Sequence, residues 1–296
     1  MTKTALKTRS VARAFSSLRT LEGEGVEIGR AFPTQQLEDI DPFLLLDHMG
    51  PIVIKPGEAL GFPEHPHRGF ETVTYLLEGQ IEHKDSFGNR GLLEAGDVQW
   101  MTAGSGLVHS EMPGRELVRT GGRLEGFQLW VNLPRRDKMT PPRYQELKSA
   151  GIPRATSAGG DVQVRVIAGE SLGTRGAIES RTPILYLHLA LEPGATHTQA
   201  VPESFNAFAI VIRGQAQFSG HPEPQGPGRV VVFAKDGDET SISNPSSEPA
   251  ELLLIAGEPI GEPVERYGPF VMNTRDEIMK AFRDFREGKM GTISGS

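Results

Sequence analysis

Residues 65–77 read H-P-H-R-G-F-E-T-V-T-Y-L-L, and residues 104–111 read G-S-G-L-V-H-S-E. Each phrase holds two potential metal ligands two residues apart: His65 and His67 in the first, His109 and Glu111 in the second. Residues i and i+2 of an extended strand point to the same face of a sheet. Two such strands that face each other would bring all four side chains to one point. The two phrases therefore predict a metal site built on β-strands.

The donor set of this predicted site narrows the choice of metal. Three imidazoles and one carboxylate suit Fe(II), Mn(II), Co(II), Ni(II), Cu(II) or Zn(II), and suit Mg²⁺ or Ca²⁺ poorly. Closed structural zinc sites usually contain thiolates, and the chain has no cysteine. Four protein ligands on an octahedral ion leave two positions open for a substrate or O₂. The other five histidines are interpreted as solvated or satisfied in the core: His48, His83, His188, His197 and His221.

The composition bounds the class of protein. A length of 296 residues suggests about two domains, and 35 glycines with 22 prolines favour many short strands joined by turns. A net charge of −7 argues against a broad nucleic-acid-binding surface. No apolar run is long enough to span a bilayer, and residues 1–15 lack the apolar core of a secretory signal. We therefore expect a cytoplasmic protein that contacts neither membrane nor nucleic acid directly.

Short strands are predicted along the whole chain. Alternating or β-branched stretches mark them at residues 11–15, 70–77, 81–85, 92–101 (with a turn at Gly96-Asp97) and 127–133. The pattern then recurs, because Y-L-L-E-G-Q at residues 75–80 resembles I-V-I-R-G-Q at residues 210–215. A repeat this long indicates a duplicated domain and not a solenoid.

The repeat predicts two antiparallel β-barrels of the jelly-roll type, residues 1–138 and residues 139–296. The proline-rich and charged segment 134–142 is the predicted linker, and its basic cluster Arg135 to Lys138 is expected to be solvated. The repeat offset carries the four ligand positions onto residues that do not match them: Ala200, Pro202, Asn244 and Ser246. Only the N-terminal barrel is therefore expected to bind a metal.

A helix is predicted at the C-terminal end. Thr274 stands three residues before Glu277, which is the pattern of a capping box. Apolar residues follow at helical spacing, and Gly288 is a plausible stop: Ile278, Ala281, Phe282 and Phe285 form the predicted face. We expect this amphipathic helix to cover apolar surface of the barrel.

The two metal phrases resemble cupin motifs. The first cupin motif, G-x5-H-x-H-x3,4-E-x6-G, is matched with small departures by Gly61, His65, His67, Glu71 and Gly79. In the second motif, residues 103–106 replace the usual Pro-x-Gly, and His109 is followed by Glu111. The chain resembles the pirin family in particular, through D-P-F-L-L-L-D-H at residue 41, A-G-S-G-L-V-H-S-E-M-P at residue 103, G-P-F-V-M-N-T at residue 268 and G-K-M-G at residue 288.

This resemblance implies an all-β bicupin with one metal, usually iron, in the N-terminal barrel. The family's three His and one Glu ligands map onto His65, His67, His109 and Glu111, whereas Glu71 is expected to be a strand residue or a partner of a ligand. Several pirins open the ring of the flavonol quercetin with O₂. Eukaryotic members act instead as nuclear co-regulators that sense redox state through the iron.

The favoured interpretation is a dioxygenase that takes O₂ and a flavonol-like substrate, with Glu111 as ligand and proton acceptor. Candidate lining residues of its pocket are Phe70, Leu107, Met112 and Phe127. Two alternatives stay open. One is a non-catalytic iron protein that regulates a protein partner. The other is a zinc- or nickel-loaded isomerase or hydrolase, because a cupin fold does not decide the reaction.

Overall fold

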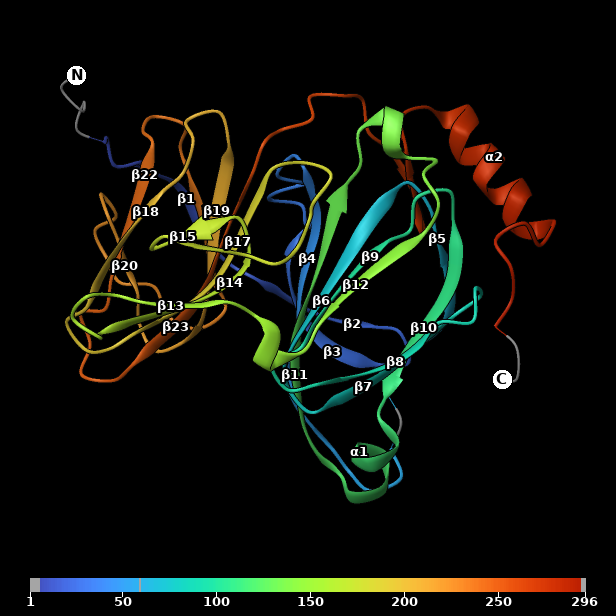
Figure 1. Cartoon of the computed structure of the whole chain (residues 1–296), viewed down its shortest axis with the longest axis horizontal. Coiled ribbons are helices and arrows are strands. Elements are labelled where there is room, and N and C mark those ends of the chain that lie inside the picture. The colour runs from blue at the N-terminus through green and yellow to red at the C-terminus, as the bar shows by residue number, and fades with distance from the viewer. Residues whose placement is uncertain (1–5, 59, 294–296) are drawn as a thin grey trace. The chain divides into compact units, whose positions relative to one another are not determined.

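The computed structural model describes residues 6–58 and 60–293, and it consists mainly of antiparallel sheets (Figure 1). The start of the segment scanned for a secretory signal, residues 1–5, lies outside the described residues. Within the described ranges, no helix has both the length and the apolar character needed to cross a membrane. The predicted all-β class with a C-terminal helix is confirmed.

The chain forms two compact units. The first unit comprises Leu18–Gly151 and Ile260–Ser296, and the second comprises Met1–Ser17 and Ile152–Pro259. These bounds differ from the predicted division at residues 138 and 139. The N-terminal strand β1 (Val11–Ser16) pairs with β21 (Arg229–Phe233) of the second unit, and the C-terminal helix packs on a strand of the first. The N-terminal strand β1 therefore belongs to the unit formed mainly by the C-terminal half of the chain. The C-terminal helix belongs to the unit formed mainly by the N-terminal half.

The first unit contains a large sheet and a small sheet. The large sheet has seven strands in the order β12 (Arg143–Leu147), β9 (Val98–Thr102), β6 (Phe70–Glu78), β11 (Gly122–Asn132), β4 (Phe43–Ile54), β3 (Val26–Phe32) and β2 (Leu18–Glu22). The small sheet has four strands in the order β5 (Phe62–His67), β10 (Leu107–Pro113), β7 (Gln80–Asp85) and β8 (Arg90–Glu94). The first unit also holds a two-stranded ribbon and short helices: β24 (Glu265–Tyr267), β25 (Phe270–Met272), α1 (Arg115–Thr120), η1 (Arg135–Asp137) and η2 (Ser149–Gly151).

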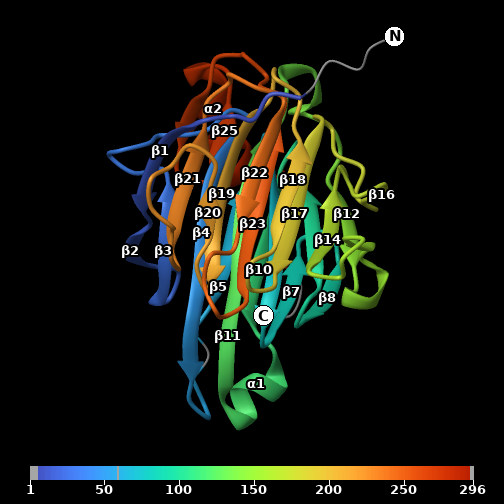
Figure 2. The ribbon, with the colours of Figure 1, turned by 90° about the vertical axis from the view of Figure 1, so that its left-hand side faces the viewer.

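The second unit likewise has one large sheet, which is accompanied by two smaller sheets. Its seven-stranded sheet runs β1, β21, β19 (Asn206–Arg213), β23 (Ala250–Gly257), β17 (Ile184–Leu191), β14 (Val162–Ala168) and β13 (Arg154–Thr156), most of which are labelled in Figure 2. The smaller sheets are formed by β18 (Thr196–Ala200), β22 (Glu239–Ser243) and β20 (Gln217–Phe218), and by β15 (Glu170–Ser171) and β16 (Thr174–Arg175). Among the described strands the hydrogen bonding does not close into a continuous barrel, so each unit is an open two-sheet jelly roll.

The predicted C-terminal helix is α2 (Arg275–Arg286), and its ends lie where the sequence placed them. The Thr274 hydroxyl accepts a hydrogen bond from the backbone N–H of Glu277 at 3.3 Å. Helix α2 is followed by Gly288 in the left-handed conformation, at a φ of 74°. Ile278 and Ala281 are buried as predicted, but Phe285 is 38% exposed. Asp284 is buried at 4% exposure, and it pairs there with Arg68, which follows β5, and with Lys280 of its own helix.

The predicted solvated linker is wrong at Lys138. Its side chain is only 1% exposed. The ammonium nitrogen donates to the carbonyl oxygens of Gly69 (2.8 Å) and Val271 (3.1 Å), and to Asn132 Oδ1 (2.6 Å). Lys138 therefore joins the turn after β5, the end of β11 and strand β25. Sequence could not show this, because a lysine in a charged run has the same local pattern whether solvated or buried.

Candidate metal centre

The register of the small sheet places the predicted ligands on one face. In the pairing of β10 with β5, His109 stands opposite His65 and Leu107 opposite His67. Directly opposed residues of an antiparallel pair share a face. On the other side of β10, Glu111 stands opposite His83 of β7. One face of this four-stranded sheet therefore carries four imidazoles and the Glu111 carboxylate.

Three of these imidazoles converge. The potential ligand atoms of His65, His67 and His109 all lie within 4.8 Å of one another. Their ring centroids are 4.3 Å apart for His65 and His109, 4.7 Å for His65 and His67, and 4.9 Å for His67 and His109. The prediction that both phrases aim at a common point therefore holds for the three histidines.

Backbone carbonyls orient two of the three rings. Because a carbonyl can only accept, His65 Nδ1 donates to the oxygen of Pro63 (2.7 Å) and His67 Nδ1 donates to that of Pro269 (3.3 Å). This leaves the Nε2 lone pair of each ring free to bind a metal, which is the usual arrangement of a metal-binding histidine. Pro269 lies far along the chain, so the C-terminal segment helps to build the site.

The unsatisfied nitrogens of the cluster fit a metal ion. His67 Nε2 and both ring nitrogens of His109 are buried and have no hydrogen-bond partner among the described residues. Such groups are rare in folded proteins because leaving them unpaired costs about 1–3 kcal/mol each. Burial lowers the pKa values of His67 and His109 below the ordinary value, and the neighbouring His65 lowers both further. Both rings are therefore neutral at neutral pH, which is the form that binds a metal.

The carboxylate of Glu111 lies outside the group whose ligand atoms fall within 4.8 Å, as far as the described residues go. Its Oε1 accepts from the Thr74 hydroxyl (2.8 Å), and its Oε2 accepts from Gln128 Nε2 (2.8 Å). Gln128 is itself held by Trp130, whose Nε1–H donates to Gln128 Oε1 (3.2 Å). A shift of register between His109 and Glu111 in the β10–β5 pairing accompanies this placement. The role of Glu111 as a fourth ligand stays a prediction.

Two further residues differ in how well sequence anticipated them. Glu71 is 1% exposed and accepts from the Thr102 hydroxyl of β9 at 2.6 Å. Since Phe70, its neighbour on β6, contacts the His67 ring, Glu71 points to the opposite face of the large sheet. His83 was interpreted as solvated or satisfied, yet it is 1% exposed, and neither ring nitrogen has a hydrogen-bond partner among the described residues. Its ring lies 6.1 Å from that of His109, so it belongs to the surroundings of the cluster.

A cavity of about 550 Å³ opens beside His65 and His67. This volume falls within the range of small-molecule sites. None of the four predicted lining residues lines it. Its wall is instead formed by apolar and charged side chains from several strands: Leu45, Phe62, Trp130, Arg30, Asp47 and Arg266. Sequence analysis missed these residues because each is ordinary in its local pattern, and only the register of distant strands brings them together.

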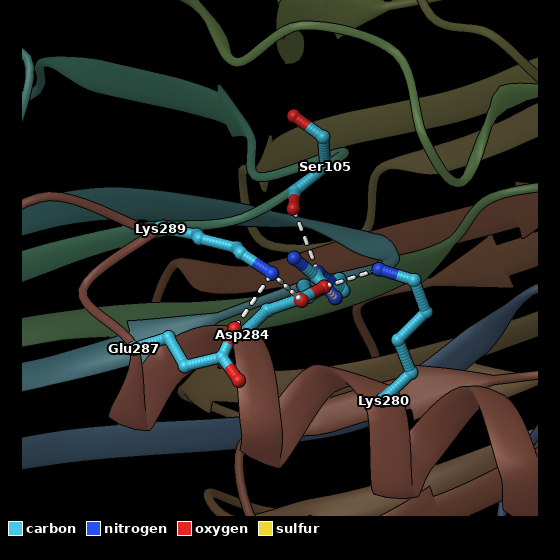
Figure 3. A network of polar contacts seen from close by, with 6 residues as sticks. Ser105, Lys280, Asp284, Glu287 and Lys289 are labelled. Carbon is cyan, nitrogen blue, oxygen red and sulfur yellow. Dashed lines mark hydrogen bonds and ion pairs between the residues drawn. The ribbon is translucent and has the colours of Figure 1, made fainter.

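A buried ionic network ties α2 to both metal-site loops (Figure 3). Arg68, which follows His67, donates through Nη1 to Asp284 Oδ2 (2.8 Å) and through Nε to the carbonyl oxygen of Ser105 (2.7 Å). Asp284 also binds Lys280 at 2.6 Å and Lys289 at 3.1 Å. The hydrogen bonds from Lys280 and Arg68 hold the pKa of Asp284 well below its ordinary value. The loop at Ser105 precedes β10, so one carboxylate braces the segments that carry His67 and His109.

Acid is expected to destabilise the metal-free protein. Burial lowers the pKa values of His67, His83 and His109 in the folded state. The unfolded chain therefore binds more protons than the folded chain below about pH 6.5, and stability falls as the pH falls through this range. Urea unfolding of the metal-free protein at about pH 7.5 and about pH 5.5 measures the effect. His83→Leu should reduce the slope, by at most one proton, and a slope of zero in the unsubstituted protein would contradict the expectation.

Comparison with known proteins places the chain among characterised sequences. The family model described as Pirin matches residues 25–131, and the model described as Pirin C-terminal cupin domain matches residues 186–291. A pirin-like protein of Solanum lycopersicum is 46% identical over 270 residues, which cover 91% of this chain and 89% of the relative. Pirin of Homo sapiens is 43% identical over 286 residues, which cover 96% and 94%.

Solved structures share the architecture. A quercetin 2,3-dioxygenase from Acinetobacter baumannii superposes with a TM-score of 0.90 at 38% identity and covers 97% of this chain and 100% of that one. A bacterial pirin from Escherichia coli, solved in complex with nickel(II), has a TM-score of 0.63 at 21% identity, which shows the common fold. Both halves of the chain are therefore cupin domains, as the bicupin prediction requires. Together with the identity to the curated relatives, these matches establish that the chain belongs to the pirin family.

Proposed function

We propose that the protein is a metal-dependent dioxygenase that opens the ring of a flavonol-like, quercetin-type substrate with O₂. The proposed metal is a single divalent ion, Fe(II) in the first instance, with Mn(II), Co(II), Ni(II), Cu(II) or Zn(II) as the other ions that this donor set accepts. The proposed ligands are His65, His67, His109 and Glu111. We propose the cytoplasm as its location.

The observation that carries this proposal is the histidine cluster at the wall of a small-molecule cavity. His65 and His67 line the cavity of about 550 Å³, and the buried nitrogens of His67 and His109 have no partner among the described residues. Trp130 and Phe62 offer the cavity flat apolar surface, which suits a planar aromatic molecule. The resemblance to a quercetin 2,3-dioxygenase at 38% identity supports the same reaction.

Each residue of the site has its own role in the proposed reaction. A metal held by His65, His67, His109 and Glu111 would supply Lewis acidity to the substrate. Glu111 accepts the proton of the substrate hydroxyl at its carboxylate. Thr74 and Gln128 hold this carboxylate through one hydrogen bond to each oxygen. Trp130 fixes the amide of Gln128 and, with the other apolar lining residues, excludes water from the reacting groups.

A second candidate is a non-catalytic, iron-binding regulator that changes its contact with a protein partner when the metal changes oxidation state. The curated relatives favour it, since those that are 43% to 46% identical carry the name pirin and not that of an enzyme. The same ligands serve both functions. A regulator would bind metal tightly, turn over no flavonol and retain a protein partner in a pulldown.

Flavonol-dependent O₂ uptake by the purified protein, loaded separately with each of the six metals, tests the dioxygenase. We expect turnover with at least one metal and a decrease of about a hundredfold or more in Glu111→Gln, because a positioned proton acceptor contributes on this scale. Glu116→Gln, on the exposed face of α1, removes a carboxylate that pairs with Arg119 and should leave the rate unchanged. Stoichiometric metal binding without turnover in any of the six loaded forms would overturn the proposal and favour the regulator.

A further inference from the structure

The cavity beside the histidine cluster contains a cation that no carboxylate neutralises by direct contact. Arg266 of β24 lines this cavity together with His65 and His67. Its guanidinium carbon lies 4.9 Å from the centre of the Trp130 ring, and its Nη1 donates to the carbonyl oxygen of Leu44 at 3.0 Å. In the part of the chain that the structure describes, it forms no ion pair within 4.0 Å.

Arg30, which lines the same cavity, differs from Arg266 because carboxylates pair directly with its guanidinium. Its Nε and Nη2 donate to the two oxygens of Asp47 at 2.8 and 2.7 Å, and its Nη1 lies 2.8 Å from Glu22. The guanidinium of Arg30 is therefore already occupied by the carboxylates of Asp47 and Glu22. Arg266 donates one hydrogen bond, to the carbonyl oxygen of Leu44, so most of its five N–H groups remain available to a ligand.

The environment of Arg266 strengthens the attraction of its available N–H groups for an anion. The side chain is half-buried, and desolvation lowers the pKa of Arg266 from its ordinary value, with the positive charge of Arg30 as the next cause. The carboxylates of Asp47, Asp39 and Glu38 act on Arg266 only through longer-range attraction, which raises its pKa, and Asp47 is already bound by Arg30. A charged fork in a partly desolvated cavity binds a carboxylate or phenolate more strongly than the same fork in water.

The stacking of Arg266 on Trp130 also restricts the shape of the ligand. The guanidinium carbon of Arg266 lies over the indole of Trp130, and both planar groups line the cavity. Phe62 and Leu45 add apolar wall. A planar aromatic ring fits these walls, and an anionic oxygen on that ring fits the guanidinium.

We propose that Arg266 forms an oxyanion subsite, and that the site selects planar aromatic molecules carrying a carboxylate or phenolate oxygen besides the group that faces the histidine cluster. This substrate class rests on the proposed function for its role in turnover. Binding at Arg266 requires only the geometry of the cavity, so binding and turnover can be tested separately.

The test measures binding of 2-naphthoate and of its uncharged analogue 2-naphthamide to the full chain, both metal-free and loaded with redox-inactive Zn(II). Isothermal titration gives the affinity. We expect the carboxylate to bind about tenfold more tightly than the amide, since one charge-assisted fork is worth about 1.4 kcal/mol or more. Arg266→Gln should abolish this preference, and Arg266→Lys, which keeps the charge but loses the fork, should retain part of it.

Arg283→Gln is the matched control, because it removes the same charge from the exposed face of α2. It should preserve the preference for the carboxylate. Equal affinity for the two probes in the unsubstituted protein, or an unchanged preference in a folded Arg266→Gln or Arg266→Lys variant, would overturn the subsite. Since no O₂ chemistry enters this measurement, a failure of flavonol turnover would leave the binding result intact, and the reverse also holds.

Discussion

Replacing His109 with alanine is expected to abolish tight metal binding while leaving the metal-free protein folded. The ring centroid of His109 lies 4.3 and 4.9 Å from those of His65 and His67, and both of its nitrogens are buried without a hydrogen-bond partner in the described chain. Loss of groups that merely orient a ligand weakens metal binding by about 10- to 100-fold, so loss of the ligand itself should cost more than a hundredfold. Titration with Co(II) or Zn(II) measures the affinity directly.

Unfolding experiments give an independent measure of the same loss. A metal present at a hundredfold excess over its dissociation constant stabilises the protein that binds it by about 2.7 kcal/mol. The unsubstituted protein should show this gain, and His109→Ala should not. His221→Ala, at a histidine of the second unit, is the control and should keep the full gain. Metal affinity of His109→Ala equal to that of the unsubstituted protein would exclude His109 from the site.

Replacing Lys138 with methionine is expected to lower the free energy of unfolding by about 3 kcal/mol. Methionine fills a similar volume but leaves three buried acceptors without a donor, on Gly69, Asn132 and Val271. Each unsatisfied group costs about 1–3 kcal/mol, and relief of the buried charge offsets part of the sum. Lys138→Gln can donate to two of the acceptors, so it should recover part of the loss. Urea denaturation at neutral pH measures all three proteins.

The same lysine should give stability a distinctive pH dependence. Burial lowers the pKa of Lys138 to about 7, whereas an unfolded lysine titrates near about 10.4. Between these values the folded state binds fewer protons than the unfolded state, so stability rises with pH from about 7 to about 10. Lys138→Met should lack this rise. A difference in stability between the two proteins that stays constant across this window would contradict the lowered pKa.

The histidine cluster shows what the spacing of residues along a strand can and cannot predict. The alternation of His65 with His67 puts both imidazoles on one face of β5 because a strand repeats every two residues. The same rule places His109 and Glu111 on one face of β10, but it does not decide how deep each side chain lies. Hydrogen bonds from Thr74 and Gln128 hold the Glu111 carboxylate in place, and these donors come from other strands.

Errors of the sequence analysis occurred where a residue's partners are distant in the chain. Lys138 looked like part of a solvated linker, and Phe285 looked like part of the buried face of α2. In both cases the local pattern was compatible with two environments. Lys138 is buried because oxygens on three different segments surround it, and Asp284 is buried in place of Phe285 because Arg68 pairs with it.

By itself, the sequence determined the all-β class, the duplication, the capped C-terminal helix and the cluster of three histidines, since each depends on periodicity, spacing or a repeat that the sequence shows directly. Tertiary structure alone decided the cavity-facing surroundings of those histidines. Trp130 of β11 and Arg266 of β24 meet although they lie far apart in the chain, and Pro269 reaches His67 because the C-terminal segment returns to the first unit. Such contacts follow from strand register and from the summed packing of the unit, which no local pattern contains.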